Sequence, residues 1–492
     1  MTIAYVTTNE AQPAQVTYVT TQQSKPAQVT YVTAGPPPLP PQTTYVQVRT
    51  RRPTKQNAHT AASGILLFAY GGMDMAQGLG WNISTDLPTT SEMQYSWFIG
   101  VIIGAFVSGL TINHIPKSVF YTLGGLMLLI DGIIFVSTSE YTSLLAARYV
   151  GGIGIGLITV AFIIHNSEIT MKNSRGFWCG VEQYGLALGI AIQVILDTSL
   201  DDGINSAHGI FGIVFSLVAT AFVAVSVESP IFYLRKNNEE QALTQLKILY
   251  AHSGNAEIYN AALDEAKQYV STATSQSSGA LLAASVMPFI KMLFSRCLVP
   301  LTISLPLSYS MITSTVVADL AFNWPIIVWG LLRWFGTFFS MPLLDRVGRK
   351  FVSLLGLLCM AGLMLGMAGI YSDATRLIST YYMSQVCHLS MAFQFFAGLY
   401  IPCTSTYLGE AFPLKVKSFF IALIVCLEQV IHIIVIETCA MKLNLFYQYF
   451  LAVGIILVVG LIIFAVLMPE TRGLSLRQAT GRFNRVHDVM AH

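Results

Sequence analysis

Residues 445–468 read LFYQYFLAVGIILVVGLIIFAVLM, a run without a single Asp, Glu, Lys or Arg. A helix needs roughly 20 mostly apolar residues to cross the hydrocarbon core of a bilayer, so this run predicts a membrane-spanning helix. The whole chain has the same character, because 54% of its 492 residues are hydrophobic and only 11% are charged. Soluble domains carry about 25% charged residues. The sequence therefore predicts an integral, multi-pass membrane protein.

Eleven further apolar segments precede this run. They lie near residues 61–81, 94–112, 118–137, 143–166, 177–197, 209–227, 298–320, 324–343, 351–371, 380–408 and 418–438. Each is expected to be a helix, since a segment in hydrocarbon must satisfy its own backbone hydrogen bonds. Basic residues gather in alternate connectors, which places both chain ends in the cytoplasm. The predicted fold class is an all-α membrane protein with twelve transmembrane helices.

The spans divide the chain into five parts. We expect a disordered cytoplasmic tail at 1–60, a six-helix half at 61–227, a cytoplasmic linker at 228–297, a second six-helix half at 298–470 and a cytoplasmic tail at 471–492. The first tail repeats PAQVTYVT at 13–20 and 26–33. Its proline run at 36–41 is expected to be extended, and two interpretations stay open: a docking site for an SH3-type partner, or a disordered spacer.

Charged positions recur in the two halves. Glu168 is followed seven residues later by Arg175, and Glu410 is followed at the same spacing by Lys417. Two equal halves with matching charged positions indicate an internal duplication. Such duplication is typical of secondary transporters.

Five sequence motifs occur in a fixed order along the chain. They are ARYVGGIGIG at 147–156, Glu168 with RG at 175–176, DRVGRK at 345–350, YLGEAFP at 407–413 and PETRG at 469–473. With these motifs the chain resembles the sugar-porter family of the major facilitator superfamily, which includes facilitative glucose transporters and insect trehalose transporters. The resemblance covers about residues 61–477. It implies two six-helix halves that move a small polar solute, namely a sugar or polyol, by alternating access.

Charged residues at the cytoplasmic ends of the spans are predicted to form a latch between helices. Carboxylates that face guanidinium groups make strong, often bidentate hydrogen bonds, although the same residues could simply be solvated topology signals. The expected latch residues are Arg148, Glu168, Arg175, Asp345, Arg346, Arg349, Glu410 and Lys417. The first-half copy of the DRVGRK motif has been lost at 113–118, so we expect few ion pairs for Glu168.

Polar side chains inside the apolar spans are the candidates for solute binding, because each sugar hydroxyl that loses water needs a hydrogen-bond partner. Gln183 stands where the family places a sugar-binding Gln. The other candidates are Glu182, Ser314, Glu428 and Gln429. Purely structural pairing of the charged ones stays open as an alternative. The second half departs from the family, since Met311 and Ile312 stand where its paired Gln belongs.

Proton coupling is a separate question. The Asp that proton symporters carry on span one aligns with Gly71, while Asp74 lies one turn away and could pair with Arg148. We expect facilitated diffusion in preference to proton symport, with Asp74 and Arg148 as the coupling pair if symport occurs.

Further expectations concern partners and other classes of function. Asn82 begins a glycosylation sequon. No enzyme, cofactor or metal motif stands out, and the scattered basic residues do not indicate a nucleic-acid partner. The expected partners are a small polar solute and membrane lipid, and the expected location is the plasma membrane. Two alternatives remain: a non-transporting solute sensor or scaffold, and a carrier of organic anions drawn by Arg333 and Arg148.

Overall fold

The computed structural model describes residues 2–4, 46–48, 55–81, 90–250, 256–319, 324–438 and 443–486. The chain divides into two units, Met1–Arg52 and Pro53–His492. In the first unit, strand β1 (Thr2–Ala4) pairs antiparallel with strand β2 (Val46–Val48). The repeats and the proline run lie outside the described residues, so the expected disorder of the tail stays a prediction.

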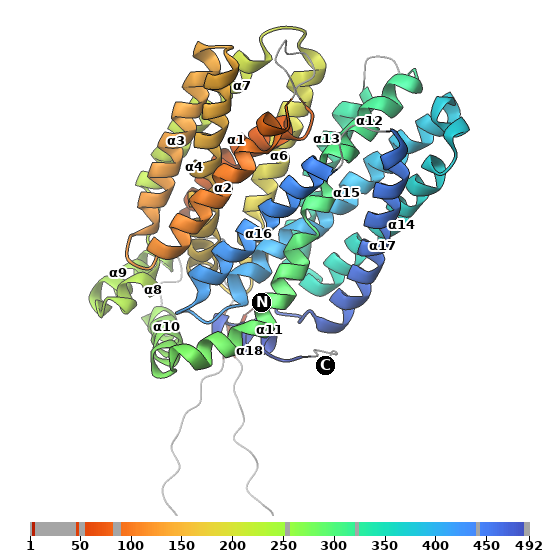
Figure 1. Cartoon of the computed structure of the whole chain (residues 1–492). Helices are drawn as coiled ribbons and strands as arrows, with labels where there is room; N and C mark the ends of the chain where they lie inside the picture. Colours follow the sequence, from red (N-terminus) through yellow and green to blue (C-terminus); the bar gives the residue numbers. More distant parts are fainter. Residues whose placement is uncertain are drawn as a thin grey trace, which may run out of the picture. The chain divides into compact units, whose positions relative to one another are not determined.

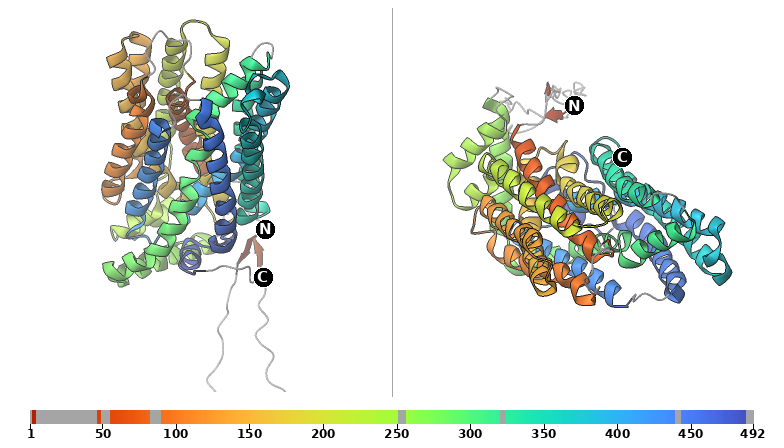
Figure 2. Two further views of the ribbon diagram at one scale, coloured as in Figure 1. Left: turned by 45° about the vertical axis from the view of Figure 1, so that its right-hand side comes forward. Right: turned by 90° about the horizontal axis from the view of Figure 1, so that it is seen from above.

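The second unit is helical, and its first half contains six membrane-length segments. They are α1 (Lys55–Gly78), α2 (Ser91–Thr111), α3 (Lys117–Ser137), α4 (Tyr141–Ile169), α5 (Arg175–Cys179) continued by α6 (Val181–Ser199), and α7 (Ile204–Ala224). Helix α1 already begins at Lys55, a few residues before the expected end of the tail. Figures 1 and 2 show these long helices running side by side.

The second half repeats this arrangement. It contains α11 (Ser278–Cys297), η1 (Pro300–Thr302), α12 (Leu305–Val317), α13 (Trp324–Arg346), α14 (Arg349–Tyr371), η3 (Ala374–Ile378), α15 (Thr380–Glu410), α16 (Lys417–Thr438) and α17 (Leu443–Leu467). Four further helices, α8 (Pro230–Arg235), α9 (Glu239–Leu249), α10 (Ala256–Ser275) and α18 (Leu476–Phe483), lie at the cytoplasmic end, the lower end in Figure 1.

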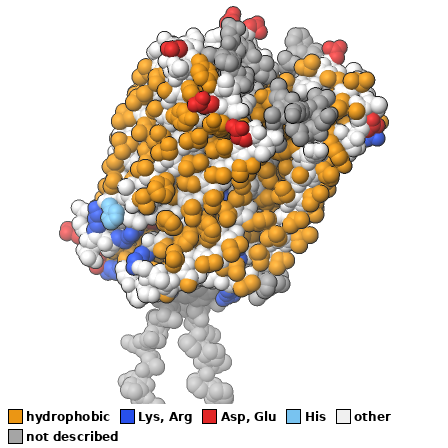
Figure 3. Space-filling model, in the orientation of Figure 1, with side chains coloured by type: hydrophobic (Ala, Val, Ile, Leu, Met, Phe, Trp, Pro, Cys, Tyr) orange, Lys and Arg blue, Asp and Glu red, His pale blue; other side chains and the backbone are white. Residues whose placement is uncertain are grey.

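The twelve-helix expectation is confirmed. Within the described ranges, ten helical segments are long and apolar enough to cross a membrane, and α1 together with the α5–α6 segment completes the set. Apolar side chains point outward from these helices, as on α3, where Leu123, Leu126 and Ile130 are exposed. In Figure 3 apolar side chains cover the middle of the visible face, and charged ones lie mainly toward its ends.

Span seven begins earlier than the expected start at residue 298. Helix α11 lies wholly within the predicted linker. However, Ser278–Val317, which contains both α11 and α12, is one of the ten segments that are long and apolar enough to cross a membrane. Lys291 and Arg296 lower the hydropathy of α11, but both are buried and bonded inside the protein. The linker boundary at residue 297 therefore moves toward Ser278.

Close contacts between glycines show the duplication in three dimensions. A Cβ atom on Gly100 of α2 would lie 2.9 Å from the Cα of Gly152 on α4. A Cβ atom on Gly336 of α13 would likewise lie 2.9 Å from the Cα of Gly398 on α15. These are the second and fourth helices of their respective halves. Both halves therefore use a glycine pair to bring the same two helices together.

Candidate functional site

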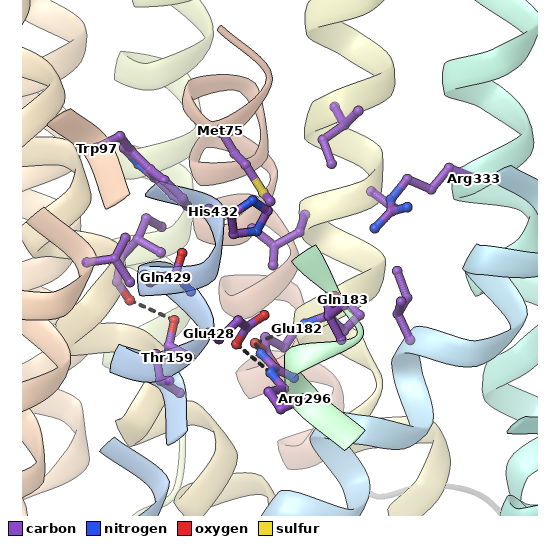
Figure 4. A pocket seen from close by; sticks show the side chains of 18 residues that line it. Met75, Trp97, Thr159, Glu182, Gln183, Arg296, Arg333, Glu428, Gln429 and His432 are labelled. Carbon is purple, nitrogen blue, oxygen red and sulfur yellow. Dashed lines mark hydrogen bonds and ion pairs between the residues drawn. The ribbon is translucent and has the colours of Figure 1, made fainter. Parts of the chain in front are cut away.

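A small enclosed cavity lies between the two halves and has a volume of about 30 Å³. Helices α1, α2, α4 and α6 of the first half line it together with α11, α13, α15 and α16 of the second half. Its polar side chains, most of them visible in Figure 4, are Thr159, Glu182, Gln183, Arg296, Arg333, Glu428, Gln429 and His432. The cavity is therefore a polar site built by both halves at their interface.

Arg296 of α11 lies at the centre of this polar group and is 2% exposed. Its Nη2 lies 2.5 Å from Oε1 of Glu182, and its Nε lies 2.6 Å from Oε2 of Glu428. Its Nη1 also donates to the hydroxyls of Thr404 and Ser405 on α15, at 3.1 and 3.0 Å. The Ser405 hydroxyl in turn donates to Glu182. Arg296 therefore ties Glu182 of the first half to three helices of the second.

Several polar atoms face the cavity without a protein partner. In the described part of the chain, Oε1 of Gln429 and Nε2 of His432 accept or donate no hydrogen bond. The His432 ring stacks on Phe98 with 4.6 Å between ring centroids. Gln183 donates from Nε2 to Glu182 at 3.2 Å. These atoms can exchange hydrogen bonds with a hydroxylated molecule.

Formal charges cancel around the cavity. Glu182 and Glu428 carry two negative charges, and Arg296 and Arg333 carry two positive ones. Arg333 donates to the carbonyl and hydroxyl oxygens of Thr302 and to Gln394, at 3.0–3.1 Å. Both guanidinium groups are therefore bonded within the protein.

Four of the five predicted solute-binding residues line this cavity, namely Glu182, Gln183, Glu428 and Gln429. Ser314 does not. Its hydroxyl donates to the carbonyl of Met311 at 3.0 Å and accepts from the thiol of Cys387 on α15 at 3.1 Å. Ser314 thus lies in the α12–α15 packing. Sequence reasoning missed Arg296, because its charge made α11 look like part of a linker.

At the cytoplasmic end, an ion-pair network joins the halves. Glu410 of α15 accepts from Arg175 of α5 at 2.9 Å and also from Arg349 of α14. The carboxylate of Asp345 accepts the backbone N–H groups of Gly176 and Phe177, at 2.9 and 2.8 Å. The structure thus brings four predicted latch residues together across the interface between the halves.

The first-half copy of this network is built from different residues. Lys117 pairs with Glu168 at 3.3 Å and with Glu228 at 3.4 Å. Lys417 of α16 donates to the hydroxyl of Ser167 at 2.7 Å, which again joins the two halves. In the described part of the chain Glu168 makes one ion pair, with Lys117 of the changed 113–118 segment, which agrees with the few ion pairs that we expected.

Two predicted latch residues make other contacts. Arg148 precedes Glu168 by 20 residues on the same helix α4, which separates them by about 30 Å at 1.5 Å per residue. Its side chain bonds to Met93 and Gln77 near the external end, so its place in the cytoplasmic latch was wrong. Arg346 is exposed, and its carbonyl oxygen accepts from Arg472 at 2.6 Å.

In the structure, Arg148 and the Asp74 carboxylate have other partners than the ones that we expected. Arg148 donates to the backbone carbonyl of Asp74 at 2.9 Å. The Asp74 carboxylate instead contacts His208 of α7 at 3.2 Å. Together with Asp131 these two residues offer three possible ligand atoms within 4.8 Å of one another. The candidate glycosylation site Asn82 lies outside the described residues.

The fold and the two-sided cavity define a secondary transporter of the major facilitator type. The family model described as "Sugar (and other) transporter" matches residues 42–483, so the chain belongs to this family of sugar transporters. The expected family is confirmed, and the chain is a transporter rather than an enzyme.

Known relatives are distant in sequence but match over most of the chain. Hexose transporter 1 of Plasmodium knowlesi is 23% identical over 417 residues, which cover 78% of this chain and 81% of that protein. The high glucose sensor RGT2 of Saccharomyces cerevisiae is 22% identical over 512 residues, covering 90% of this chain and 63% of that protein. The structure of the E. coli proton:xylose symporter XylE bound to 6-bromo-6-deoxy-D-glucose has a TM-score of 0.69 and 18% identity, covering 87% of this chain and 99% of that one.

Proposed function

We propose that this protein carries a neutral, polyhydroxylated solute of the hexose class across the plasma membrane by alternating access, as a facilitated-diffusion carrier. The observation that carries the proposal is the enclosed polar cavity between the halves, in which the formal charges cancel. The named hexose transporter and the sugar-bound XylE agree with a sugar as the solute.

Charge balance favours a neutral solute over an organic anion. Arg296 is already bonded to two carboxylates, Glu182 and Glu428, and Arg333 is bonded to neutral acceptors. An anion that paired with Arg296 would have to displace Glu182 or Glu428 and would then be repelled by the displaced group. A neutral polyol can use Gln183, Gln429 and His432 without disturbing the ion pairs.

The same contacts favour facilitated diffusion over proton symport. Both cavity carboxylates, Glu182 and Glu428, are held by Arg296 at 2.5 and 2.6 Å. The adjacent guanidinium of Arg296 favours the ionised form of both carboxylates, and these contacts are the support for facilitated diffusion.

Contacts at both ends of the cavity supply the gates. At the external end, the rings of Trp81 and Trp329 lie 5.1 Å apart, and Gln94 donates to Tyr309 at 3.3 Å. At the cytoplasmic end the halves are joined through Glu410 and its partners. Alternating access requires each set to break in turn while the other holds.

The test is radiolabelled uptake into proteoliposomes with hexoses, trehalose, inositol and organic acids. We expect saturable uptake of neutral sugars, reduced about fivefold or more in Gln183→Ala, since a lost hydrogen bond to a solute costs about 1 kcal/mol or more. Ser314→Ala is the matched control, because that hydroxyl lies away from the cavity. Preference for the acids would identify an anion carrier. Sugar-induced thermal stabilisation without flux would identify a sensor, the function that the name of RGT2 states for that relative.

A further inference from the structure

A second buried polar cluster lies inside the first half, away from the cavity between the halves. It consists of Asp74 on α1, Asp131 on α3 and His208 on α7, and all three are 0% exposed. Helix α7 packs against both α1 and α3 (Figure 1). Each residue offers one ligand atom, and the three atoms lie within 4.8 Å of one another. The cluster therefore gathers three electron-pair donors from three helices.

The carboxylates of the cluster are largely without hydrogen-bond partners. In the described part of the chain, Oδ2 of Asp74 and both carboxylate oxygens of Asp131 are buried and accept no hydrogen bond. The Oδ2 atoms of the two residues converge over Gly151 of α4, where a Cβ atom would lie 2.9 and 2.7 Å from them. The hydrogen bonds that Arg148 makes within the described ranges go to neutral oxygens, among them the carbonyl of Asp74. Two converging buried carboxylates repel each other unless a positive charge lies between them.

Gln193 of α6 orients the imidazole ring of His208. Nε2 of Gln193 donates to the carbonyl of Trp81 at 3.4 Å and to Asp197 at 3.1 Å. Its amide oxygen is therefore the atom that faces Nδ1 of His208, at 2.9 Å, and it accepts the ring hydrogen there. Nε2 of the neutral ring keeps its lone pair and lies 3.2 Å from Oδ1 of Asp74. Metal-binding histidines are held in the same way, with the other ring nitrogen donating to an oxygen of the protein.

The donor atoms of the cluster indicate which kind of cation fits. Mg²⁺ and Ca²⁺ prefer oxygen ligands, whereas an imidazole nitrogen beside carboxylates suits Zn²⁺ and its first-row neighbours. Bonds of about 2.0–2.2 Å in a tetrahedral zinc site place two ligand atoms about 3.3–3.6 Å apart. Nε2 of His208 and Oδ1 of Asp74 lie close to that separation. The Asp131 carboxylate can turn toward the ion without breaking a hydrogen bond.

The hydroxyl group of Tyr70 provides a further oxygen beside the cluster. Tyr70 precedes Asp74 by one turn of α1, so both side chains lie on the same face of the helix. Its ring packs against His208 with 5.0 Å between ring centroids. Tyr70 is 0% exposed, and its hydroxyl oxygen has no hydrogen-bond partner among the residues that the structure describes. A buried, unpaired hydroxyl calls for a partner, and a bound ion supplies one directly or through a water molecule.

We propose that Asp74, Asp131 and His208 bind one divalent transition-metal ion, and that Zn²⁺ is the ion that their donor atoms fit best. The ion balances the charge of the two carboxylates and joins α1, α3 and α7. It lies apart from the solute cavity, because none of the three residues lines that cavity. Its role is structural, since three crosslinked helices move as one body when the halves rock.

The first experiment measures metal content and does not depend on transport. The protein is expressed with added Zn²⁺, purified in detergent, dialysed against a chelator to remove surface ions, and analysed by elemental mass spectrometry. We expect one Zn²⁺ per chain in the wild type and none in His208→Gln or Asp131→Asn. His208→Cys should restore binding, because a thiolate is also a zinc ligand.

The matched control is His388→Gln, which removes an exposed histidine on α15 of the other half. This variant should keep the zinc content of the wild type. Wild-type protein without zinc would overturn the proposal. Full zinc content in either His208→Gln or Asp131→Asn would overturn it as well, because the ion would then lie at another site.

The second experiment tests the ligands by spectroscopy. Co²⁺ supplied in place of Zn²⁺ should give the visible absorption of a four-coordinate cobalt ion in the wild type. The absorption should be lost in His208→Gln, and His208→Cys should add a thiolate-to-metal charge-transfer band. An identical spectrum for the wild type and His208→Cys would exclude His208 as a ligand.

The third experiment tests whether the ion joins the helices. Zinc-loaded wild type should unfold at least about 3 °C above wild type expressed without zinc, because an ion that binds only the folded protein stabilises it. The difference should vanish in His208→Gln. Equal unfolding temperatures for the two wild-type preparations would refute the crosslink. Stabilisation by Na⁺ or by protons alone would replace the metal ion with that cation and overturn the proposal.

Discussion

Arg296 lies between two carboxylates that belong to different halves of the molecule, Glu182 and Glu428. Such a triad is sensitive to the loss of its centre. Removing one partner of a buried ion pair leaves an uncompensated charge and costs about 3–5 kcal/mol, although the intact pair itself adds little stability. The value of Arg296 therefore lies in holding the two carboxylates charged and close together.

Replacing Arg296 by Met tests this role. We expect Arg296→Met to lower the free energy of unfolding by about 3–5 kcal/mol, measured by thermal denaturation in detergent. Arg296→Lys should be less harmful but should not restore transport, because an ammonium group lacks the fork that reaches both carboxylates. Unchanged stability in Arg296→Met would show that the carboxylates are neutral without it.

The sequence predicted part of this site and could not predict the rest. Gln183 was found from its match to a position of the family, and Glu428 because a charged side chain interrupts a long apolar run. Arg296 was missed because hydropathy assigned its positively charged helix to a linker, and its compensating partners lie 114 and 132 residues away. His208 was missed for a similar reason, since Asp74 precedes it by 134 residues.

Among the elements, the ends of α5, α13 and α15 meet at the cytoplasmic latch. Glu410 is 0% exposed and receives Arg175 from the first half and Arg349 from its own half. The sequence predicted that these three residues belong to a latch, and the structure shows how they pair. Helix geometry excludes Arg148, because that residue and Glu168 lie about 30 Å apart on one straight helix.

Neutralising Glu410 should open the latch. We expect Glu410→Gln to favour the state that is open to the cytoplasm, because Arg175 and Arg349 lose their shared counter-ion. Cys179, buried one turn after Arg175, is a native reporter. Its labelling by a membrane-impermeant maleimide from the cytoplasmic side should become at least about tenfold faster than in the wild type.

Labelling is assigned to that thiol by the loss of signal in Cys179→Ser. Lys415→Gln is the matched control for charge loss at the same end, since Lys415 bonds to Ser278 within its own half. An unchanged labelling rate in Glu410→Gln would contradict a gating role for the network.

The close contact between α13 and α15 at Gly336 and Gly398 gives a second prediction at the scale of helices. Gly398→Val should destabilise the α13–α15 pair, because even a Cβ atom there would lie 2.8 Å from the Cα of Gly336. Overpacking of this kind costs about 1–3 kcal/mol, which lowers the unfolding temperature. Gly362→Val on α14 is the matched control, since a Cβ atom there meets nothing within 4 Å. Equal unfolding temperatures for the two variants would mean that α13 and α15 can move apart freely.

In the molecule as a whole, contacts between the halves close both ends of the cavity at once. The external closure is formed by uncharged side chains, through the aromatic packing of Trp81 on Trp329 and the Gln94–Tyr309 hydrogen bond. The cytoplasmic closure contains buried ion pairs. The pairing at neither end could be derived from the sequence, because Trp81–Trp329, Gln94–Tyr309 and Arg175–Glu410 each join residues from different halves.

Removing the aromatic contact should open the external end. An aromatic pair contributes about 0.5–1.5 kcal/mol beyond its area, so Trp329→Ala should raise the ratio of externally open to closed protein by about three- to tenfold. Hydrogen–deuterium exchange should accelerate in α12 and the first turns of α13 but not around Glu410. Trp324→Ala, an exposed tryptophan on the same helix, should change neither region. Faster exchange at both ends of Trp329→Ala would indicate general destabilisation instead.

The balanced charges of the cavity also bear on the membrane potential. Moving one elementary charge through 100 mV changes the free energy by about 2.3 kcal/mol. The two carboxylates and two guanidinium groups that enclose the cavity sum to zero, and a sugar adds nothing to them. The transport cycle then moves little net charge through the field. Uptake should proceed at the same rate in polarised and depolarised cells, so voltage neither drives nor blocks this carrier.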